Sequence, residues 1–192
     1  MAPTELVLKK RRTRSDYLFH LEYRTRWSDN DMYAHLNNSI YAFLIDSIVN
    51  TYLIKHCGLD PFSSRSSAPP PLSPSSSTSS STLPARPSQI GLVVSSYCDY
   101  FASVSFPDVL DLGLRVVKLG TSSVMYEVGI FSRGEETVKA VGGFTHVFVE
   151  KKPEVKTGGG GGGKTARKGM DERIRSGLER LMLNDVTGSS KL

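Results

Sequence analysis

A run of glycines near the C-terminus carries the most recognisable chemical pattern of the chain. Residues 157–165, TGGGGGGKT, contain G-x-x-x-x-G-K-[ST], the loop in which backbone N–H groups and a lysine hold nucleotide phosphates. That loop works only between a buried strand and a helix of a larger parallel sheet. Pro153 interrupts the approach from the preceding apolar run, and too few residues follow Thr165 to build such a sheet. We therefore interpret the run as a linker that binds no nucleotide.

Cysteine and histidine are the other side chains with nucleophilic or metal-binding chemistry. Cys57 directly follows His56, but adjacent residues of a helix do not face each other, which argues against a Cys–His catalytic pair. His20 and His146 alternate with apolar residues in strand-like runs, so we expect them in the core or an interface. The spacing of His, Cys and Asp predicts no metal site. Two cysteines do not make a disulfide framework and fit a reducing compartment.

Polar side chains concentrate in residues 28–38, SDNDMYAHLNN, between two segments of different periodicity. Asp and Asn there can bond their own backbone or cap a helix. The following residues 38–57 are apolar around most of a helical circumference, which predicts a buried helix. Asn37 or Asn38 is the expected N-cap, and Gly58 is placed to end the helix.

The remaining periodic segments predict strands. Residues 17–27 alternate apolar and polar side chains, as a half-buried strand does. Four further strand-like runs follow, at 90–104, 109–120, 122–132 and 137–150. Short connections between them predict an antiparallel meander. One strand, one buried helix and four strands indicate the α+β class, with an antiparallel sheet curled around the helix.

Composition separates one folded region from its flanks. Residues 17–150 are the predicted domain, and the Ser/Pro-rich residues 60–88 are a disordered insertion within it. Residues 1–16 are predicted to be a basic disordered tail. Residues 151–170 are a basic, glycine-rich linker, and residues 171–192 are a short amphipathic helix and tail. Deletion of Thr157–Leu192 is expected to leave the domain folded.

Charge and hydropathy exclude several classes of partner. The excess of positive charge lies in the two ends of the chain, and the predicted domain between them is net acidic. Without a basic folded face carrying stacking aromatics, no nucleic-acid partner is expected. No stretch has the ~18 apolar residues of a membrane span. The N-terminus lacks the apolar segment of a secretory signal, so a cytoplasmic location is expected. Because the N-terminus is basic, a mitochondrial targeting sequence is the alternative.

The order of elements, together with WSDNDMYAHLNNSIYAFLIDS, resembles the hotdog-fold acyl-CoA thioesterases and in particular their hydroxybenzoyl-CoA thioesterase branch. That branch carries an aromatic residue, D-x-D, a small residue, often His-Val-Asn-Asn, and a tyrosine at the helix start. The matching residues here are Trp27, Asp29, Asp31, Ala34, His35, Leu36, Asn37, Asn38 and Tyr41. The family usually has glycine in place of Ala34, which would permit a positive φ or close approach of substrate.

The resemblance implies hydrolysis of an acyl-CoA to free acid and thiol. Asp31 would be the nucleophile or general base, and the backbone N–H of Asn38 would stabilise the oxyanion at the helix N-terminus. Coenzyme A would be part of the substrate, and no separate cofactor is expected. Two alternatives stay open: Asp31 merely caps its loop, or the chain is a non-catalytic hotdog module that binds a thioester or oligomerises.

Further substrate-binding residues are inferred from the same motif and from charge. The candidates at the site are His35, Asn37, Tyr41, Asp46, Ser122 and Ser123. Structural alternatives accompany them: a loop-stabilising hydrogen bond for His35, a cap for Asn37, packing for Tyr41 and a satisfied structural carboxylate for Asp46. The phosphates of coenzyme A predict a basic rim, for which the candidates are Arg115, Lys118, Arg133 and Lys139. The resemblance also implies a homodimer or homotetramer with active sites between subunits.

Overall fold

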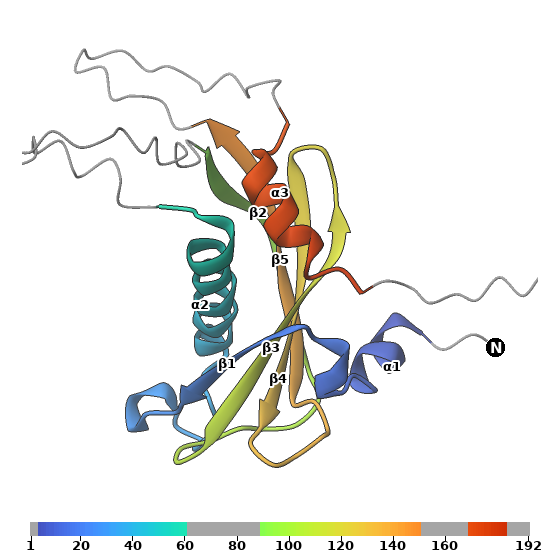
Figure 1. Cartoon of the computed structure of the whole chain (residues 1–192). Helices are drawn as coiled ribbons and strands as arrows, with labels where there is room; N and C mark the ends of the chain where they lie inside the picture. Colours follow the sequence, from blue (N-terminus) through green and yellow to red (C-terminus); the bar gives the residue numbers. More distant parts are fainter. Residues whose placement is uncertain (1–3, 61–88, 151–168, 184–192) are drawn as a thin grey trace, which may run out of the picture.

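The computed structural model of the protein describes residues 4–60, 89–150 and 169–183 (Figure 1). Within these ranges a long helix packs against a five-stranded sheet, and shorter helices precede and follow it along the chain. The predicted insertion and glycine linker lie outside the described residues, apart from their ends. Among the described helices, none is long and apolar enough to cross a membrane.

Five antiparallel strands form the sheet in the spatial order β1-β3-β4-β5-β2. They are β1 (Phe19–Arg24), β2 (Gln89–Tyr100), β3 (Val109–Leu119), β4 (Ser123–Ser132) and β5 (Ala140–Glu150). The predicted meander is correct for β3, β4 and β5, but β2 pairs with β5 instead of β3. The connection at residues 101–108 carries the chain from one edge of the sheet to β3 beside β1, which leaves β1 and β2 as the two edges.

The long helix α2 (Asn38–Cys57) begins and ends as predicted. The Asn37 side chain accepts a hydrogen bond from the Ser39 N–H at 3.0 Å and caps the first turn. Gly58 follows the last turn with a φ of 70°, a left-handed conformation that glycine adopts without a Cβ clash. Phe43 and Ile54 are 65% and 43% exposed, so the helix is buried on one side and not all around. Its buried residues are Tyr41, Leu44, Ile45, Ile48, Val49, Tyr52, Leu53 and Cys57.

Helix α3 (Glu172–Glu179) belongs to the core, which corrects the expectation that this part of the chain is dispensable. The Asp171 side chain caps it by accepting a hydrogen bond from the Arg173 N–H at 2.9 Å. Ile174 and Leu178 are 0% exposed and pack in the same cluster as α2. The Tyr52 hydroxyl donates a 2.7 Å hydrogen bond to the Gly177 carbonyl. Amphipathic spacing predicted the helix, and its buried side chains are Ile174, Gly177 and Leu178. In the cartoon, α3 lies in front of the sheet near the C-terminal end of α2 (Figure 1).

The N-terminal segment also differs from the disordered tail expected over residues 1–16. It contains helix α1 (Glu5–Lys10) and the short helix η1 (Arg14–Asp16), and both lie on the side of the sheet away from α2 (Figure 1). Its basic side chains pair with acids of the sheet: Lys9 with Asp99 at 2.9 Å, Arg12 with Glu127 at 3.0 Å, and Arg14 with Asp111. Three of the five basic side chains in this segment are therefore held in ion pairs with the sheet.

Tyr17 anchors this segment to the outer face of the sheet. Its ring lies over Gly113 and Gly129, which face each other across β3 and β4. A Cβ at either glycine would come within 2.7 Å of Tyr17 atoms, so both positions need glycine for this packing. The Tyr17 hydroxyl donates to Glu127 at 3.2 Å, and Arg115 pairs with the same carboxylate at 2.9 Å.

Candidate active site

The loop before α2 is organised around Asp29, which is only 5% exposed. The short helix η2 (Trp27–Asp29) leads into the loop, and the Asp29 carboxylate accepts hydrogen bonds from the Tyr23 hydroxyl and the Arg26 N–H, both at 2.8 Å. Its carbonyl accepts from the Asn37 N–H at 2.8 Å. These contacts agree with the expectation that Asp side chains in residues 28–38 bond to nearby backbone groups. Both ends of the loop are thereby tied to one buried carboxylate residue.

Asp31 lies in the middle of this loop and is partly exposed. Its Oδ1 atom accepts hydrogen bonds from the N–H groups of Tyr33 at 2.8 Å and His35 at 3.1 Å. The Asp31 N–H donates to the His35 carbonyl at 2.7 Å, which closes the turn. Within the described part of the chain no hydrogen bond reaches Oδ2. One oxygen therefore fixes the carboxylate, and the other is available for chemistry.

Ala34 closes the same turn in a left-handed conformation, with a φ of 60°. Its N–H donates to the Asp31 carbonyl at 3.2 Å. Left-handed backbone costs a residue with a Cβ roughly 1–2 kcal/mol. The turn geometry that glycine would adopt freely is thus kept here by alanine, at some cost in strain.

The first turn of α2 supplies the positive end of a helix dipole beside the loop. Asn37 Oδ1 accepts from both the N–H and the hydroxyl of Ser39, at 3.0 and 2.8 Å. In the part of the chain that the structure describes, the Asn38 N–H donates no hydrogen bond. Asn37 is therefore occupied as a cap, whereas the N–H of the exposed residue Asn38 has no acceptor among the described residues. An exposed donor at a helix N-terminus suits a developing negative charge.

A cleft of about 200 Å³ begins at Asn38 and runs between α2, β2 and β5. Its lining residues are Asn38, Ala42, Ile45, Ser96, Tyr97, Cys98, Tyr100 and Phe144. Tyr41 and Tyr100 pack edge to face, with ring centroids 4.9 Å apart. Burial raises the pKa of Tyr41 to about 12, so this ring is neutral near pH 7 and acts by packing.

Sequence reasoning missed the side of this cleft formed by β2 and β5. Ser96, Cys98 and Tyr100 share one face of β2, and Ser96 lies opposite Phe144 on β5. The alternation that would have revealed them is interrupted by a register shift between Val93 and Ser95. If the alternation of side chains in β2 is counted from Tyr100 toward the N-terminus, Cys98 and Ser96 fall on the same face as Tyr100.

Within the described part of the chain, the side chains of the other predicted site residues make no hydrogen bond or ion pair with the Asp31 carboxylate. The His35 side chain is exposed and makes no hydrogen bond to Asp31; only its backbone does. Asp46 is exposed on α2 and accepts a 2.9 Å hydrogen bond from Asn50 Nδ2. Ser122 and Ser123 lie at the β3–β4 turn, at the opposite end of the sheet from the start of α2 (Figure 1). Within one chain the structure does not bring these serines to the loop.

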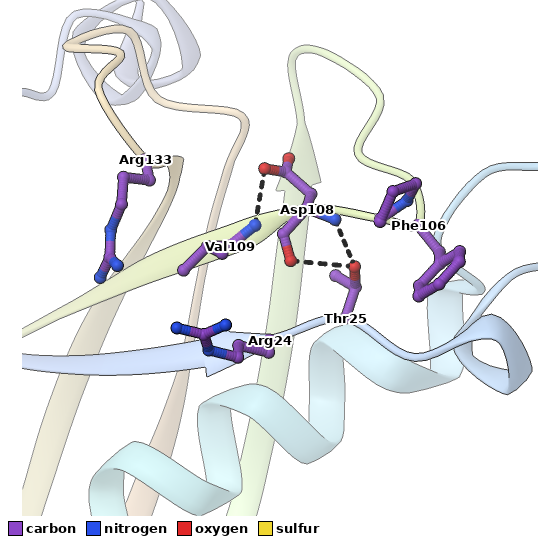
Figure 2. Close-up of a pocket in the computed structure, with 7 residues that line it drawn as sticks. Arg24, Thr25, Phe106, Asp108, Val109 and Arg133 are labelled. Carbon is purple, nitrogen blue, oxygen red and sulfur yellow. Dashed lines mark hydrogen bonds between the residues drawn. The ribbon is translucent and has the colours of Figure 1, made fainter.

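A second, shallower pocket of about 440 Å³ lies where β1 ends beside the start of β3 (Figure 2). Arg24 and Arg133 flank it, and Thr25 is hydrogen bonded to the Asp108 backbone between them. Both guanidinium groups pair with Glu22, at 3.1 and 2.6 Å. The predicted basic-rim residue Arg133 therefore has its charge matched by carboxylates.

The other predicted rim residues are also divided among separate surfaces. Arg115 is held against Glu127 on the outer face, and Lys139 pairs with Glu135 at 2.8 Å. Lys118 is exposed on β3. No common basic rim is formed around the cleft by these residues. Over residues 4–60, 89–150 and 169–183, no group of His, Cys, Asp and Glu is arranged to hold a metal ion.

This geometry has counterparts among known proteins. The sequence pattern of the thioesterase superfamily matches residues 33–139, a range that includes α2 and most of the sheet. The chain belongs to the thioesterase superfamily. The hotdog fold predicted from the sequence, with its curled antiparallel sheet and packed helix, is confirmed. Among curated proteins, none matches the sequence.

Solved structures show the same fold across bacterial relatives of this thioesterase-superfamily protein. The PA5185 protein from Pseudomonas aeruginosa is 37% identical, covers 88% of this chain and 95% of its own, and superposes with a TM-score of 0.68. A 1,4-dihydroxy-2-naphthoyl-CoA thioesterase from Synechocystis is 13% identical, covering 83% and 94%, with a TM-score of 0.58. A thioesterase from Thermus thermophilus, crystallised with coenzyme A and zinc, is 19% identical, covering 86% and 95%, also at 0.58. The last two show likeness of fold.

Proposed function

We propose that the protein hydrolyses an acyl-CoA thioester to a free acid and coenzyme A, with Asp31 as the reacting carboxylate. The observation that carries the proposal is the state of Asp31: two backbone N–H groups fix one oxygen, and the other accepts no hydrogen bond from the residues that the structure describes. The Asn38 N–H is open at the start of α2, and the cleft begins at the same residue. Family membership supports the reaction class.

In the general-base route, Asp31 Oδ2 takes a proton from water while the water oxygen bonds to the thioester carbonyl carbon. The carbonyl oxygen becomes an oxyanion, which the Asn38 N–H and the helix dipole stabilise. When the carbon–oxygen double bond re-forms, the carbon–sulfur bond breaks. The departing thiolate accepts the proton that Asp31 holds, which returns the carboxylate to its starting state.

In the nucleophilic route, the same oxygen attacks the carbonyl carbon directly and expels the thiolate. The resulting mixed anhydride between the acyl group and Asp31 is then hydrolysed by water. Both routes use the same free oxygen and the same oxyanion donor. The remaining site proposals concern binding: Asn37 and His35 form the wall beside Asp31, Tyr41 supports the cleft, and Asp46 lies farther along α2 to position water or substrate. Coenzyme A enters as part of the substrate.

The assembly that we propose is a homodimer or homotetramer in which a second copy covers β2. This strand is a sheet edge 12 residues long, and edges of this length are normally covered in native proteins. Leu92, Val93 and Val94 on it are 48%, 49% and 60% exposed. Trp27 and Met32, near Asp31, are 79% and 87% exposed, which suits a site completed by a neighbouring subunit.

The proposed function is tested by offering short, long and aromatic acyl-CoAs and trapping the released thiol with a dye. Thiol release that depends on enzyme concentration supports the hydrolase. Binding of acyl-CoA without release for any acyl group would instead support the non-catalytic module, in which the hydrogen bonds to Asp31 serve only to hold its loop. Light scattering at micromolar concentration tests the assembly, and a monomer would contradict it.

A further inference from the structure

Of the four histidines in the chain, His146 alone is buried, with 2% of its surface exposed. Its ring stacks on Phe144 with centroids 6.1 Å apart, and it meets Tyr126 and Phe148 edge to face at 5.3 and 6.2 Å. Within the part of the chain that the structure describes, neither ring nitrogen has a hydrogen-bond partner. The imidazole is therefore enclosed by aromatic rings with both of its polar atoms unpaired.

The ring also lies against an interrupted part of the sheet. His146 pairs with Val93 on the edge strand β2, and the register between β2 and β5 shifts between Val93 and Ser95. Such a bulge breaks the ladder of backbone hydrogen bonds locally. A Cβ on Gly91 would come within 2.8 Å of the His146 Nδ1 atom, so the missing side chain of Gly91 makes room for the imidazole. The ring therefore packs on β2 where the pairing of β2 with β5 is weakest.

The groups around the ring compensate a positive charge poorly. Its neighbours on β5 and β2 do not titrate; they are Phe144, Phe148, Gly91 and Val93. On β4, burial raises the pKa of Tyr126 well above its usual value, so this hydroxyl stays neutral. On α2, the exposed carboxylate of Asp46 accepts a hydrogen bond from Asn50. Burial lowers the pKa of His146, and the charge of Asp46 opposes this only in part.

We propose that His146 is an acid-sensitive latch between β5 and the edge strand β2, closed while the imidazole is neutral and opened when the ring takes up a proton. A neutral ring packs among aromatic side chains. An imidazolium carries a charge and two N–H donors, and burying these without acceptors is costly. Protonation therefore drives the ring toward water, and β2 separates from β5 at the bulge. The latch depends on the fold alone and not on the proposed hydrolysis.

The pH range in which the latch opens follows from the direction of the pKa shift. A histidine in the opened segment titrates near pH 6.5. Because the pKa of His146 is lower in the closed state, the opened state binds more protons below this pH. The latch therefore keeps its full stability above about pH 7, and its closing equilibrium falls by up to about tenfold for each pH unit below about 6.5. Unfolded carboxylates titrate only near pH 4, so their effect on stability falls at lower pH.

Amide hydrogen exchange of the full-length protein at pH 7.5 and 5.5 tests the latch, with rates corrected for the intrinsic effect of pH on exchange. In the wild type, protection of residues 91–95 and 144–148 should fall by up to about tenfold at the lower pH. His146→Phe keeps an aromatic ring without a titrating group, so its protection should stay constant. His20→Gln is the matched control, because His20 is exposed on β1, and this variant should show the wild-type fall. An equal fall in His146→Phe and in the wild type would overturn the proposal.

A second measurement, on the wild type, covers the case in which His146→Phe fails to fold. In protein with 13C-labelled histidine, the NMR signal of the His146 ring should remain that of a neutral imidazole for as long as residues 91–95 stay protected. A ring protonated at pH 5.5 while these residues keep their protection would show that the closed layer accommodates the charge, which would overturn the latch. A change in wild-type protection of less than twofold between the two pH values would also overturn it.

Discussion

The Asp31→Asn variant distinguishes two roles for the Asp31 carboxylate, catalysis and stabilisation of its loop. An asparagine carbonyl oxygen in the position of Oδ1 can still accept the hydrogen bonds from Tyr33 and His35. The free carboxylate oxygen is replaced by an amide NH2 group, which is neither a base nor a nucleophile. The variant should keep the loop and lose the chemistry.

The two expected effects differ in size. Hydrogen bonds to a charged acceptor contribute about 1.5–3 kcal/mol and those to a neutral one about 0.5–1.5 kcal/mol. Since Asp31→Asn retains both bonds in weaker form, the free energy of unfolding should fall by no more than about 3 kcal/mol. Loss of a general base costs about 100- to 10,000-fold in rate, which is about 2.7–5.4 kcal/mol of transition-state stabilisation. Asp31→Ala should lose the rate and also both loop bonds.

The assay compares kcat/KM and urea denaturation for the wild type and the two Asp31 variants. Asp29→Asn is the control, because its buried carboxylate bonds to Tyr23 and Arg26, so this variant should lose stability more than rate. A folded Asp31→Asn protein that retains more than a tenth of the wild-type kcat/KM would refute the catalytic role. An unfolded one would show that the charge mainly stabilises the loop.

Three further changes test the structural reasoning. Ala34→Gly should raise the free energy of unfolding by up to about 1 kcal/mol, because glycine relieves the left-handed strain but also makes the unfolded chain more flexible. A lower free energy of unfolding in urea would contradict this prediction. Leu178→Ala should cost about 2–5 kcal/mol, and a loss below 1 kcal/mol by the same measurement would show that α3 is not part of the core. Burial raises the pKa of Asp111, but Arg14 and Arg133 outweigh it and hold that pKa below its usual value. The stability that this lowered pKa contributes is present above about pH 4 and is lost as the pH falls through the pKa of the folded state. In the Asp111→Asn variant, the free energy of unfolding should therefore depend less on pH below about pH 4. An unchanged dependence on pH in this range would argue against the ion pairs.

Elements with a strong local pattern were predictable from the sequence. The helix from Asn38 to Cys57 follows from its apolar periodicity and from caps that lie within a few residues of its ends. The alternation in β1 and β5 likewise predicted strands. The motif around Asp31 located the loop, because Asp and Asn act there on their own backbone.

Features that depend on distant partners were not predictable. Arg12 and Glu127 are 115 residues apart, and nothing local to either indicates that the N-terminal segment crosses the sheet. The stripe of Ile174 and Leu178 predicted a helix but not the surface that buries it. In the cleft, the register shift after Val93 hid which β2 side chains face α2. Sequence periodicity identifies an element, whereas its partner depends on the complete fold.

The position of α3 also bears on how the protein is made. Chains emerge from the ribosome N-terminus first, at about 5–20 residues per second, and domains fold as units. Because Met170, Ile174 and Leu178 are buried in the cluster around α2, a segment that is synthesised after all five strands completes that cluster. Until it emerges, the nascent domain presents the uncovered end of α2 to chaperones and proteases. Premature termination before α3 would therefore expose apolar surface and favour degradation over accumulation of a shortened protein.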